Sequence, residues 1–443
     1  MSAREYTNPI YDIEVNGEVL LKSIEGEVSF DKSHTEKVLM DIQYHLLPTP
    51  GIRIVFSINN IELISCFSRF SDNSEPDVII EGKNIEGVFI SKKFNQNSNK
   101  NNLQCTFQPY SILLIEDTLD SANSIRFNLL NFPSFLCPGV PISDGHNILY
   151  KKDNISYRLG GVCLEYSDFT VHFHSLVNHE EIEDKLKQYG GYAITHVGTL
   201  EKLKSKKISF EETEKVLEII HYFISFAAGR WCPPVLIAGL DDKDNIVWEK
   251  YNTPIDSRWT YTPNWFDKFN GHYLHEVFPG FVNKWFDTKW HETMRSAIYW
   301  YLLSNTLPSK DAGIILAYAA LEILKNTYLL NNNKQALKRK YGGKFKIDSF
   351  LHELNIDTVI PSELTSINNL FGGDGPTLIT EVRNSLVHPT NRVPTNWKVP
   401  FEAWNLTQWY LDLIFLNLCN YKGQYSNRIT AGNHGQVENV PWV

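Results

Sequence analysis

Cysteine is scarce in this 443-residue sequence, and no two cysteines form a Cys-x-x-Cys pair. A zinc ribbon or a disulfide framework is therefore not indicated, and in a cytosolic chain scattered thiols are most simply reduced and buried. The sequence also lacks an apolar run long enough to span a bilayer, and its opening residues lack the apolar centre of a signal peptide. We therefore expect a cytoplasmic protein with no membrane association. The cysteines are Cys66, Cys105, Cys137, Cys163, Cys232 and Cys419.

Clear ligand-binding signatures are missing as well. The glycine-rich stretch 372–376 lacks the Gly-Lys-Ser/Thr ending that holds nucleotide phosphates, so we expect a flexible turn with Pro376 opening a helix. His172 and His174 share one face of an expected strand near His179, a spacing that a metal can use. Because no third ligand stands at a fixed spacing, an ordinary strand is favoured. The sequence thus predicts neither a cofactor nor a metal.

Positive charge is in the minority, which at first disfavours a nucleic-acid partner. The net charge is −9, but from His291 onward 14 Lys and Arg face 12 Asp and Glu, a balance of +2, which leaves 28 against 39, or −11, for the first 290 residues. Within the carboxyl-terminal third, residues 334–346 contain six basic residues and no acid. Such a run can follow a phosphate backbone, although it is also typical of a solvated face. We take as candidate RNA contacts Lys338, Arg339, Lys340 and Lys344.

The pattern of apolar and polar segments along the chain predicts an α+β protein. Up to residue 175, short β-branched and aromatic segments recur between polar breaks, for example 11–15 and 52–58, which favours an antiparallel sandwich or barrel. Residues 176–284 mix signals: helices at 180–188 and 209–228, the second with a capping box, a hairpin near 235–249, and an irregular segment around His272 and His275. We expect a helical bundle over 285–425 and a polar tail over 426–443, which is either disordered or docks its end on a partner.

One motif in the helical third carries the chemistry. Residues 377–387 have apolar positions at helical spacing, and Pro389 disfavours helical geometry at the residue before it. The helix is therefore expected to end at His388, with Arg383 and Asn384 in its last turns. The exposed carbonyls at that end favour a cation. An Arg-Asn-x-x-x-His sequence in this setting places a guanidinium and an imidazole near one another.

A fixed positive charge beside a proton carrier suits attack at a phosphate diester. Arg383 can neutralise the non-bridging oxygens, and His388 can move protons on and off the attacking and leaving oxygens. If the substrate is RNA, its own 2′-hydroxyl serves as the nucleophile, so a metal is not required. The alternative interpretation is structural: Arg383 caps carbonyls or pairs with Glu381, and His388 only ends a helix.

The surroundings of the motif resemble the HEPN superfamily of prokaryotic ribonucleases and nucleotide-binding helical domains. The motif lies between two long apolar helical segments, 311–330 and 401–420, and the first carries Glu322 in an Ala-Leu-Glu sequence. The resemblance covers about residues 285–425. It implies that Arg383 and His388 are the catalytic pair, Asn384 their polar neighbour and Glu322 a supporting acid. It also implies a homodimer, formed through the bundle, in which both motifs line one cleft.

The sequence therefore predicts a metal-independent endoribonuclease acting on an RNA substrate. A β-rich first half joined to a HEPN-like third also resembles some bacterial anti-phage proteins, which implies a toxin-like abortive-infection effector with a phage-derived trigger at the amino-terminal domain. Two alternatives stay open. One is a non-catalytic dimeric module that binds RNA or nucleotides, and the other is an enzyme that transfers a nucleotide group.

Overall fold

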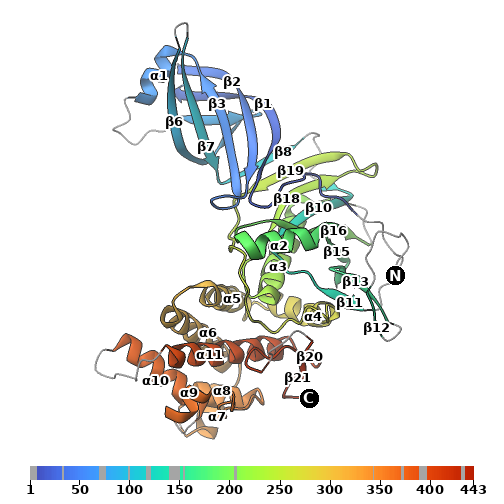
Figure 1. Ribbon diagram of the computed structural model, residues 1–443, viewed down its shortest axis with the longest axis vertical. Coiled ribbons are helices and arrows are strands. Elements are labelled where there is room, and N and C mark those ends of the chain that lie inside the picture. The colour runs from blue at the N-terminus through green and yellow to red at the C-terminus, as the bar shows by residue number, and fades with distance from the viewer. Residues whose placement is uncertain are drawn as a thin grey trace.

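The computed structural model describes residues 7–443 except 32–33, 69–75, 98–99, 116–120, 139–149, 153–154, 204–206, 343, 371–373, 389–396 and 431–434. The protein is elongated, with a curled antiparallel sheet at one end, a second sheet in the middle and helices at the other end (Figure 1). The fold is therefore mixed α+β, with a β-rich amino-terminal half and a helical carboxyl-terminal region, as the sequence predicts.

The first sheet is antiparallel throughout and has the strand order β5-β4-β1-β2-β3-β7-β6. Its strands are β1 (Glu18–Asp31), β2 (His34–His45), β3 (Gly51–Ile58), β4 (Asp77–Ile80), β5 (Lys83–Ile85), β6 (Gly87–Asn97) and β7 (Lys100–Pro109), with α1 (Ile61–Ser68) after β3. The prediction of a strand at 11–15 is wrong. That segment leads into a turn in which Asn16 has φ 62°, and the Asn16 backbone N–H donates to Tyr192 O, so the segment contacts the second sheet's connection instead of joining a ladder.

The second sheet crosses the expected boundary at residue 175. Its order is β14-β15-β16-β10-β18-β19-β8, and all its pairs are antiparallel. The strands are β8 (Ser111–Ile115), β10 (Ser124–Leu130), β14 (Val162–Tyr166), β15 (Phe169–Ser175), β16 (Ile194–Lys202), β18 (Pro234–Leu240) and β19 (Ile246–Asn252). Strands from both sides of residue 175 thus form one sheet, so the sheet extends across the expected boundary. Small pairings are formed by β9 (Ser121–Ala122), β11 (Leu136–Pro138), β12 (Tyr150–Lys152), β13 (Ile155–Leu159) and β17 (Ile208–Ser209).

Three helices precede the helical region along the chain: α2 (His179–Tyr189) between β15 and β16, α3 (Phe210–Ala228) between β17 and β18, and α4 (His272–Phe286) after β19. The predicted capping box is confirmed, because the Ser209 side chain accepts from Glu212 N–H and the Glu212 carboxylate accepts from Ser209 N–H. The irregular segment expected around His272 and His275 is instead the first turn of α4. Aromatic and aliphatic residues of α4 pack into the core, and this burial outweighs the local glycine signal.

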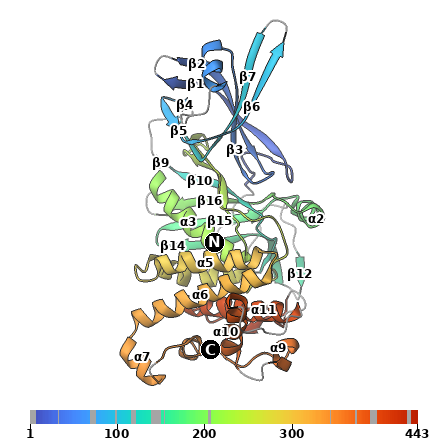
Figure 2. The same cartoon turned by 90° about the vertical axis from the view of Figure 1, so that its left-hand side faces the viewer.

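The helical region contains α5 (His291–Thr306), α6 (Lys310–Asn331), α7 (Lys334–Lys340), α8 (Ile347–Glu353), α9 (Thr365–Leu370), α10 (Gly375–Val387) and α11 (Lys398–Leu418). Figure 2 shows α5, α6 and α11 stacked across the molecule beneath the second sheet. In the described part of the chain, α6 alone is long and apolar enough to cross a membrane, by length and composition only. It packs against α5 and α11, and 44% of an 18-residue apolar segment of this helix is buried. The core helix of a soluble protein has the same properties.

The hydrophobic core of the helical region continues into the second sheet. Phe127 of β10, Phe223 of α3 and Phe415 of α11 belong to one buried cluster. A second cluster lies between the two sheets and includes Ile54 of β3 and Val197 of β16. The middle sheet is therefore covered on both faces. The helical region shares its core with that sheet and with α3.

The carboxyl-terminal tail is docked. Short strands β20 (Gln424–Tyr425) and β21 (Glu438–Asn439) pair, and Trp442 Nε1 donates to Tyr421 O at 2.7 Å. Between them, Arg428 enters the core and binds Asp412 of α11. The sequence left open whether the tail is disordered or docks on a partner; in its described residues the tail instead packs against its own chain.

Candidate functional site

The predicted motif helix is present as α10. Asp374 caps its amino end by accepting the Thr377 backbone N–H at 2.7 Å, and Pro376 lies in the first turn, where no backbone donor is needed. Its apolar residues Leu378, Ile379 and Val382 are buried and hold the helix against its neighbours α6 and α11. The polar side chains of the same helix are left at the surface or half-buried.

His388 follows the last helical residue. It has φ −117° and ψ 109°, and its backbone N–H donates to Asn384 O at 2.8 Å. Its side chain is exposed to solvent. Pro389, the residue expected to end the helix, lies outside the described residues. The imidazole is therefore accessible at the carboxyl end of α10.

Arg383 is half-buried and is held by two neighbours. Its Nη1 donates to Asn384 Oδ1 at 3.0 Å, and its guanidinium carbon lies 5.3 Å from the centroid of the Tyr318 ring of α6. A guanidinium above an aromatic face is a cation–π contact. Among the described residues Arg383 forms no ion pair with Glu381, so that part of the structural alternative is not observed. The charge of Arg383 is not neutralised by a carboxylate of its own helix.

Tyr318 joins the motif helix to Glu322. Its hydroxyl lies 3.3 Å from Thr380 Oγ1 of α10. Burial raises the pKa of Tyr318, and the nearby Glu322 carboxylate raises it further, whereas Thr380 and Arg383 lower it. Glu322 in turn accepts from Lys325 Nζ at 2.6 Å. The structure therefore brings two predicted residues, Glu322 and Arg383, to the same tyrosine ring.

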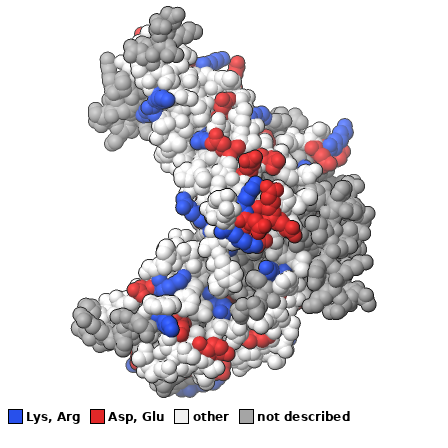
Figure 3. All heavy atoms as spheres, viewed as in Figure 1, with Lys and Arg blue, Asp and Glu red and all other residues white. Residues whose placement is uncertain are grey.

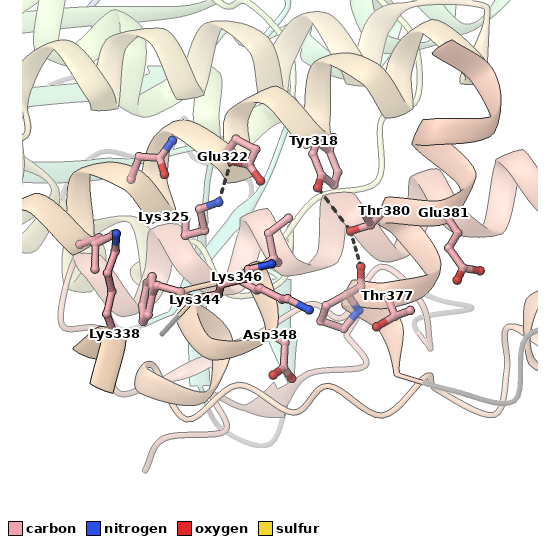
Figure 4. A pocket seen from close by; sticks show the side chains of 15 residues that line it. Tyr318, Glu322, Lys325, Lys338, Lys344, Lys346, Asp348, Thr377, Thr380 and Glu381 are labelled. Atoms are coloured by element: carbon pink, nitrogen blue, oxygen red, sulfur yellow. Dashed lines mark hydrogen bonds and ion pairs between the residues drawn. The ribbon is translucent and has the colours of Figure 1, made fainter. Parts of the chain in front are cut away.

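A groove of about 650 Å³ opens beside this cluster, between α6, the segment leading from α7 into α8, and the first turns of α10 (Figure 4). Figure 4 shows Lys344 and Lys346 reaching into the space between α6 and α10. Its acidic and basic lining residues are Glu322, Lys325, Lys338, Lys344, Lys346, Asp348 and Glu381. We call this space the lysine groove. Lys325 is paired with Glu322, so the positive charge of the lining comes mainly from the other three lysines and is partly offset by Asp348 and Glu381.

Two of the four predicted RNA contacts lie outside the lysine groove. Lys340 pairs with Glu353 at 2.6 Å, and Arg339 is exposed on α7 with its Nε donating to Gln335 O at 3.4 Å. Lys338 and Lys344 line the groove. A run of basic residues on a short helix points in several directions, so only part of it can face one groove. Lys346 and Tyr318 also line the groove but were not among the residues predicted from the sequence. Tyr318 could have been predicted, because it lies one helical turn before Glu322.

The described lining of the lysine groove does not include Arg383, Asn384 or His388. Arg383 borders it through Tyr318, whereas His388 lies eight residues after Thr380, or roughly 12 Å along a helix axis. The groove and the motif are thus adjacent, with the basic side chains at the amino end of α10 and the imidazole at its carboxyl end.

The histidines near β15 contact neighbouring groups of the fold. His174 Nε2 accepts the Thr7 backbone N–H at 3.2 Å, and His172 Nε2 lies 3.7 Å from Cys163 Sγ. Buried His196 lies 3.1 Å from Ser175 Oγ, and its pKa is lowered by burial and by neighbouring His174 and His179. Over the described ranges no group of three or more His, Cys, Asp or Glu residues is placed to hold a metal.

Charges elsewhere distinguish the helical region from the middle of the molecule. On the face shown in Figure 3, acidic side chains gather over the middle part, whereas basic and acidic side chains are interspersed over the lower, helical part. This agrees with the division of charge along the sequence. A polyanion approaching this face meets less repulsion over the helical region.

The chain is similar to YopA proteins over two segments. Residues 117–262 match the YopA central domain and residues 287–438 match the YopA C-terminal domain. A relative from Bacillus subtilis (strain 168), described as "SPbeta prophage-derived uncharacterized protein YopA", is 29% identical over 340 residues, which cover 75% of this chain and 74% of the relative. No solved structure matches the chain. The matched description over the helical region is thus that of a YopA domain, and the resemblance to HEPN proteins stays a prediction.

Proposed function

We propose that the protein is a metal-independent endoribonuclease whose site is formed by α10 and the lysine groove. The observation that carries the proposal is the position of Arg383, which is stacked on Tyr318 at the edge of the groove while His388 is exposed at the end of the same helix. A guanidinium placed on an aromatic ring keeps its N–H donors pre-oriented for phosphate oxygens.

In this proposal the lysine groove binds the RNA backbone and the motif cleaves it. Lys338, Lys344 and Lys346 contact phosphates on one side of the scissile bond, because counterion release favours such contacts. Arg383 then stabilises the charge that develops on the non-bridging oxygens at the scissile phosphate. Asn384, already bonded to Arg383, orients the guanidinium.

The chemical step is an internal transfer. The 2′-oxygen forms a bond to phosphorus while the bond from phosphorus to the 5′-oxygen breaks. His388 accepts the proton of the 2′-hydroxyl, and water or His388 of a second copy supplies a proton to the leaving 5′-oxygen. The products carry a 2′,3′-cyclic phosphate and a 5′-hydroxyl.

The test compares RNA cleavage by the wild type with that by the Arg383→Ala, His388→Ala double variant, in excess chelator. We expect the double variant to lose at least about 100-fold in rate, the usual contribution of a general acid–base group. Arg339→Ala is the matched control, because Arg339 is an exposed arginine outside the groove. An RNA with a single 2′-deoxy position should resist cleavage there. Equal cleavage by the wild type and the double variant would refute the proposal.

A second candidate is a non-catalytic module that binds RNA. It is favoured by one observation, that the described lining of the groove includes three unpaired lysines but neither Arg383 nor His388. Wild-type protein that binds single-stranded RNA through Lys338 and Lys344 but leaves it intact would support this candidate over the nuclease.

We further propose that two copies act together and that the activity belongs to a toxin-like effector. The support is the HEPN resemblance, together with a relative that is described as prophage-derived. Induced expression of the wild type should slow cell growth, and His388→Ala should restore it. Sedimentation should show a homodimer. A monomer that still cleaves RNA would contradict the shared-cleft arrangement without contradicting the nuclease itself.

A further inference from the structure

A second cavity lies where the sheets meet the helical region, away from the lysine groove. It has a volume of about 480 Å³ and is formed by the loop that follows β19, residues 256–261, and by the connection from α5 to α6, residues 305–310. We call it the junction cavity. Small-molecule sites are commonly of this size, roughly 300–1,000 Å³, and often lie between structural units.

Two basic residues line the junction cavity, one from each of the two segments that form it. Lys310 comes from the helical region and is half-buried, with Nζ 3.7 Å from the centroid of the Trp404 ring. Arg258 comes from the sheet side, and its Nη2 reaches Pro48 O of the first sheet at 3.4 Å. Burial lowers the pKa of Lys310, and the positive charge of Arg428 lowers it further. Lys310 therefore lies in a place that is costly for a cation without a counterion.

A third cation stands behind the wall of the cavity. Arg230 is buried and donates through Nη1 to Thr260 O at 2.6 Å and through Nη2 to Asn131 O at 2.7 Å. Carbonyls satisfy its N–H groups but do not neutralise its charge. Over the described residues, neither Arg230 nor Arg258 nor Lys310 forms an ion pair with a carboxylate. Among the described residues, Lys310 and Arg258 in the lining thus have no carboxylate within ion-pair distance.

The carboxylate in the lining, Asp256, does not balance these cations. Burial raises the pKa of Asp256, whereas a hydrogen bond from Tyr192 and the charge of Arg258 lower it. One acid faces two basic residues in the lining and a third behind it. A multiply charged anion would offset the remaining positive charge, and phosphate groups accept charge-assisted hydrogen bonds from both Lys and Arg.

We propose that the junction cavity binds a phosphorylated small molecule of nucleotide size. Its phosphates lie between Lys310 and Arg258, and its remaining atoms fill the space along loop residues 256–261. This assignment does not depend on the nuclease proposal, since the cavity shares no lining residue with the lysine groove. Bound ligand connects the sheet side to the first turn of α6, the helix that also carries Tyr318 and Glu322.

The test is calorimetric titration of the full-length protein with ADP, AMP and inorganic pyrophosphate at constant ionic strength. We expect saturable binding of ADP and an increase in melting temperature with its concentration, because a ligand that binds the folded state stabilises it. Lys310→Gln or Arg258→Gln should weaken binding about 10–100-fold, the value of one charge-assisted hydrogen bond. Lys310→Arg should retain binding. Lys422→Gln, at an exposed lysine that lines neither the junction cavity nor the lysine groove, is the matched control and should leave the affinity unchanged.

The three probes separate the sources of affinity. Equal affinity for ADP and pyrophosphate would assign the site to the phosphates alone, and tighter binding of ADP would assign part of it to the nucleoside; both support the proposal. Circular dichroism of each variant verifies that it is folded. The proposal is wrong if none of the probes binds saturably up to about 1 mM, which corresponds to a binding free energy of roughly 4 kcal/mol. It is also wrong if the glutamine variants bind as tightly as the wild type does.

Discussion

Two arginines of the helical region show how differently one side chain is used in the interior and at the surface. Arg428 is enclosed: it donates to both Asp412 oxygens, at 2.7 and 3.1 Å, to the Tyr301 hydroxyl at 3.0 Å and to Asn305 Oδ1 at 3.2 Å. Among the described residues, half-buried Arg383 donates one hydrogen bond, to Asn384, and otherwise contacts a tyrosine ring. The charge of the first is neutralised by the fold. That of the second is available to a ligand.

Two histidines repeat this contrast. His221 of α3 packs against the Trp231 ring, with centroids 5.0 Å apart, and its Nε2 is enclosed without a hydrogen-bond partner. His388 is exposed at the end of α10. The comparison teaches that interior groups affect folding stability, whereas the motif groups are placed where substitutions should affect ligand binding or catalysis instead.

The largest expected effect is on the interior pair. Asp412→Ala leaves Arg428 buried without its counterion, and breaking such a pair typically costs about 3–5 kcal/mol of unfolding free energy. Chemical denaturation of the variant measures this loss. The double variant Asp412→Leu, Arg428→Met removes both charges and should recover most of the stability.

The matched surface pair is Glu292 and Arg295 of α5, which is also an acid–base contact of the helical region. Glu292→Ala should cost at most about 1 kcal/mol, because an exposed ion pair is screened by water and salt. A loss as large as that of Asp412→Ala would break the distinction between interior and surface charges.

The next effect is a pH dependence set by the interior histidine. Burial lowers the pKa of His221 from 6.5 to about 4, so the folded protein favours the neutral ring. The stability contribution is therefore complete above about pH 6.5 and is lost as the pH falls toward 4, by about 1.4 kcal/mol for each pH unit. Between pH 7.5 and pH 5 the wild type should lose about 2 kcal/mol through this group.

Denaturation of His221→Gln at the same two pH values isolates this contribution. The variant cannot be protonated at this position, so its unfolding free energy should change less with pH than that of the wild type, by about 2 kcal/mol. Identical pH slopes would show that His221 is not held neutral by the fold. His388→Ala should leave the unfolding free energy at neutral pH nearly unchanged, since its side chain is exposed.

These contrasts also separate what the sequence could predict from what it could not. The start and end of α10 were predictable because caps and apolar spacing are local signals, and Asp374, Pro376 and His388 stand where the helix needs them. The pairing of Arg428 with Asp412 was not predictable. It joins a polar tail to a buried helix, and only tertiary contacts bring the two side chains together.

Non-local pairing explains the other differences. β15 pairs with β16 across the expected domain boundary at residue 175, and strand partners are not encoded in the periodicity of either strand. The basic run 334–346 was visible as charge, but the sequence alone did not separate Lys338 and Lys344, which line the groove, from Lys340, which Glu353 neutralises. Whether a lysine of this run can contact a ligand depends on the direction of its side chain and on whether a carboxylate already neutralises it.

That difference within the basic run gives the smallest effect and the finest test of the comparison. Single-stranded RNA binding should become less salt-dependent in the Lys338→Gln, Lys344→Gln variant, with the slope of log affinity against log salt reduced by about 1.4, or about 0.7 for each lost phosphate contact. Lys340→Gln removes the same charge from a lysine that Glu353 already neutralises, so its slope should stay at the wild-type value. Fluorescence anisotropy between 50 and 200 mM salt, a range of about fourfold over which such contacts weaken strongly, measures both variants. If Lys340→Gln reduces the slope as much as one groove substitution does, RNA reads the net charge of the whole segment, and the orientation of its lysines has no influence on binding.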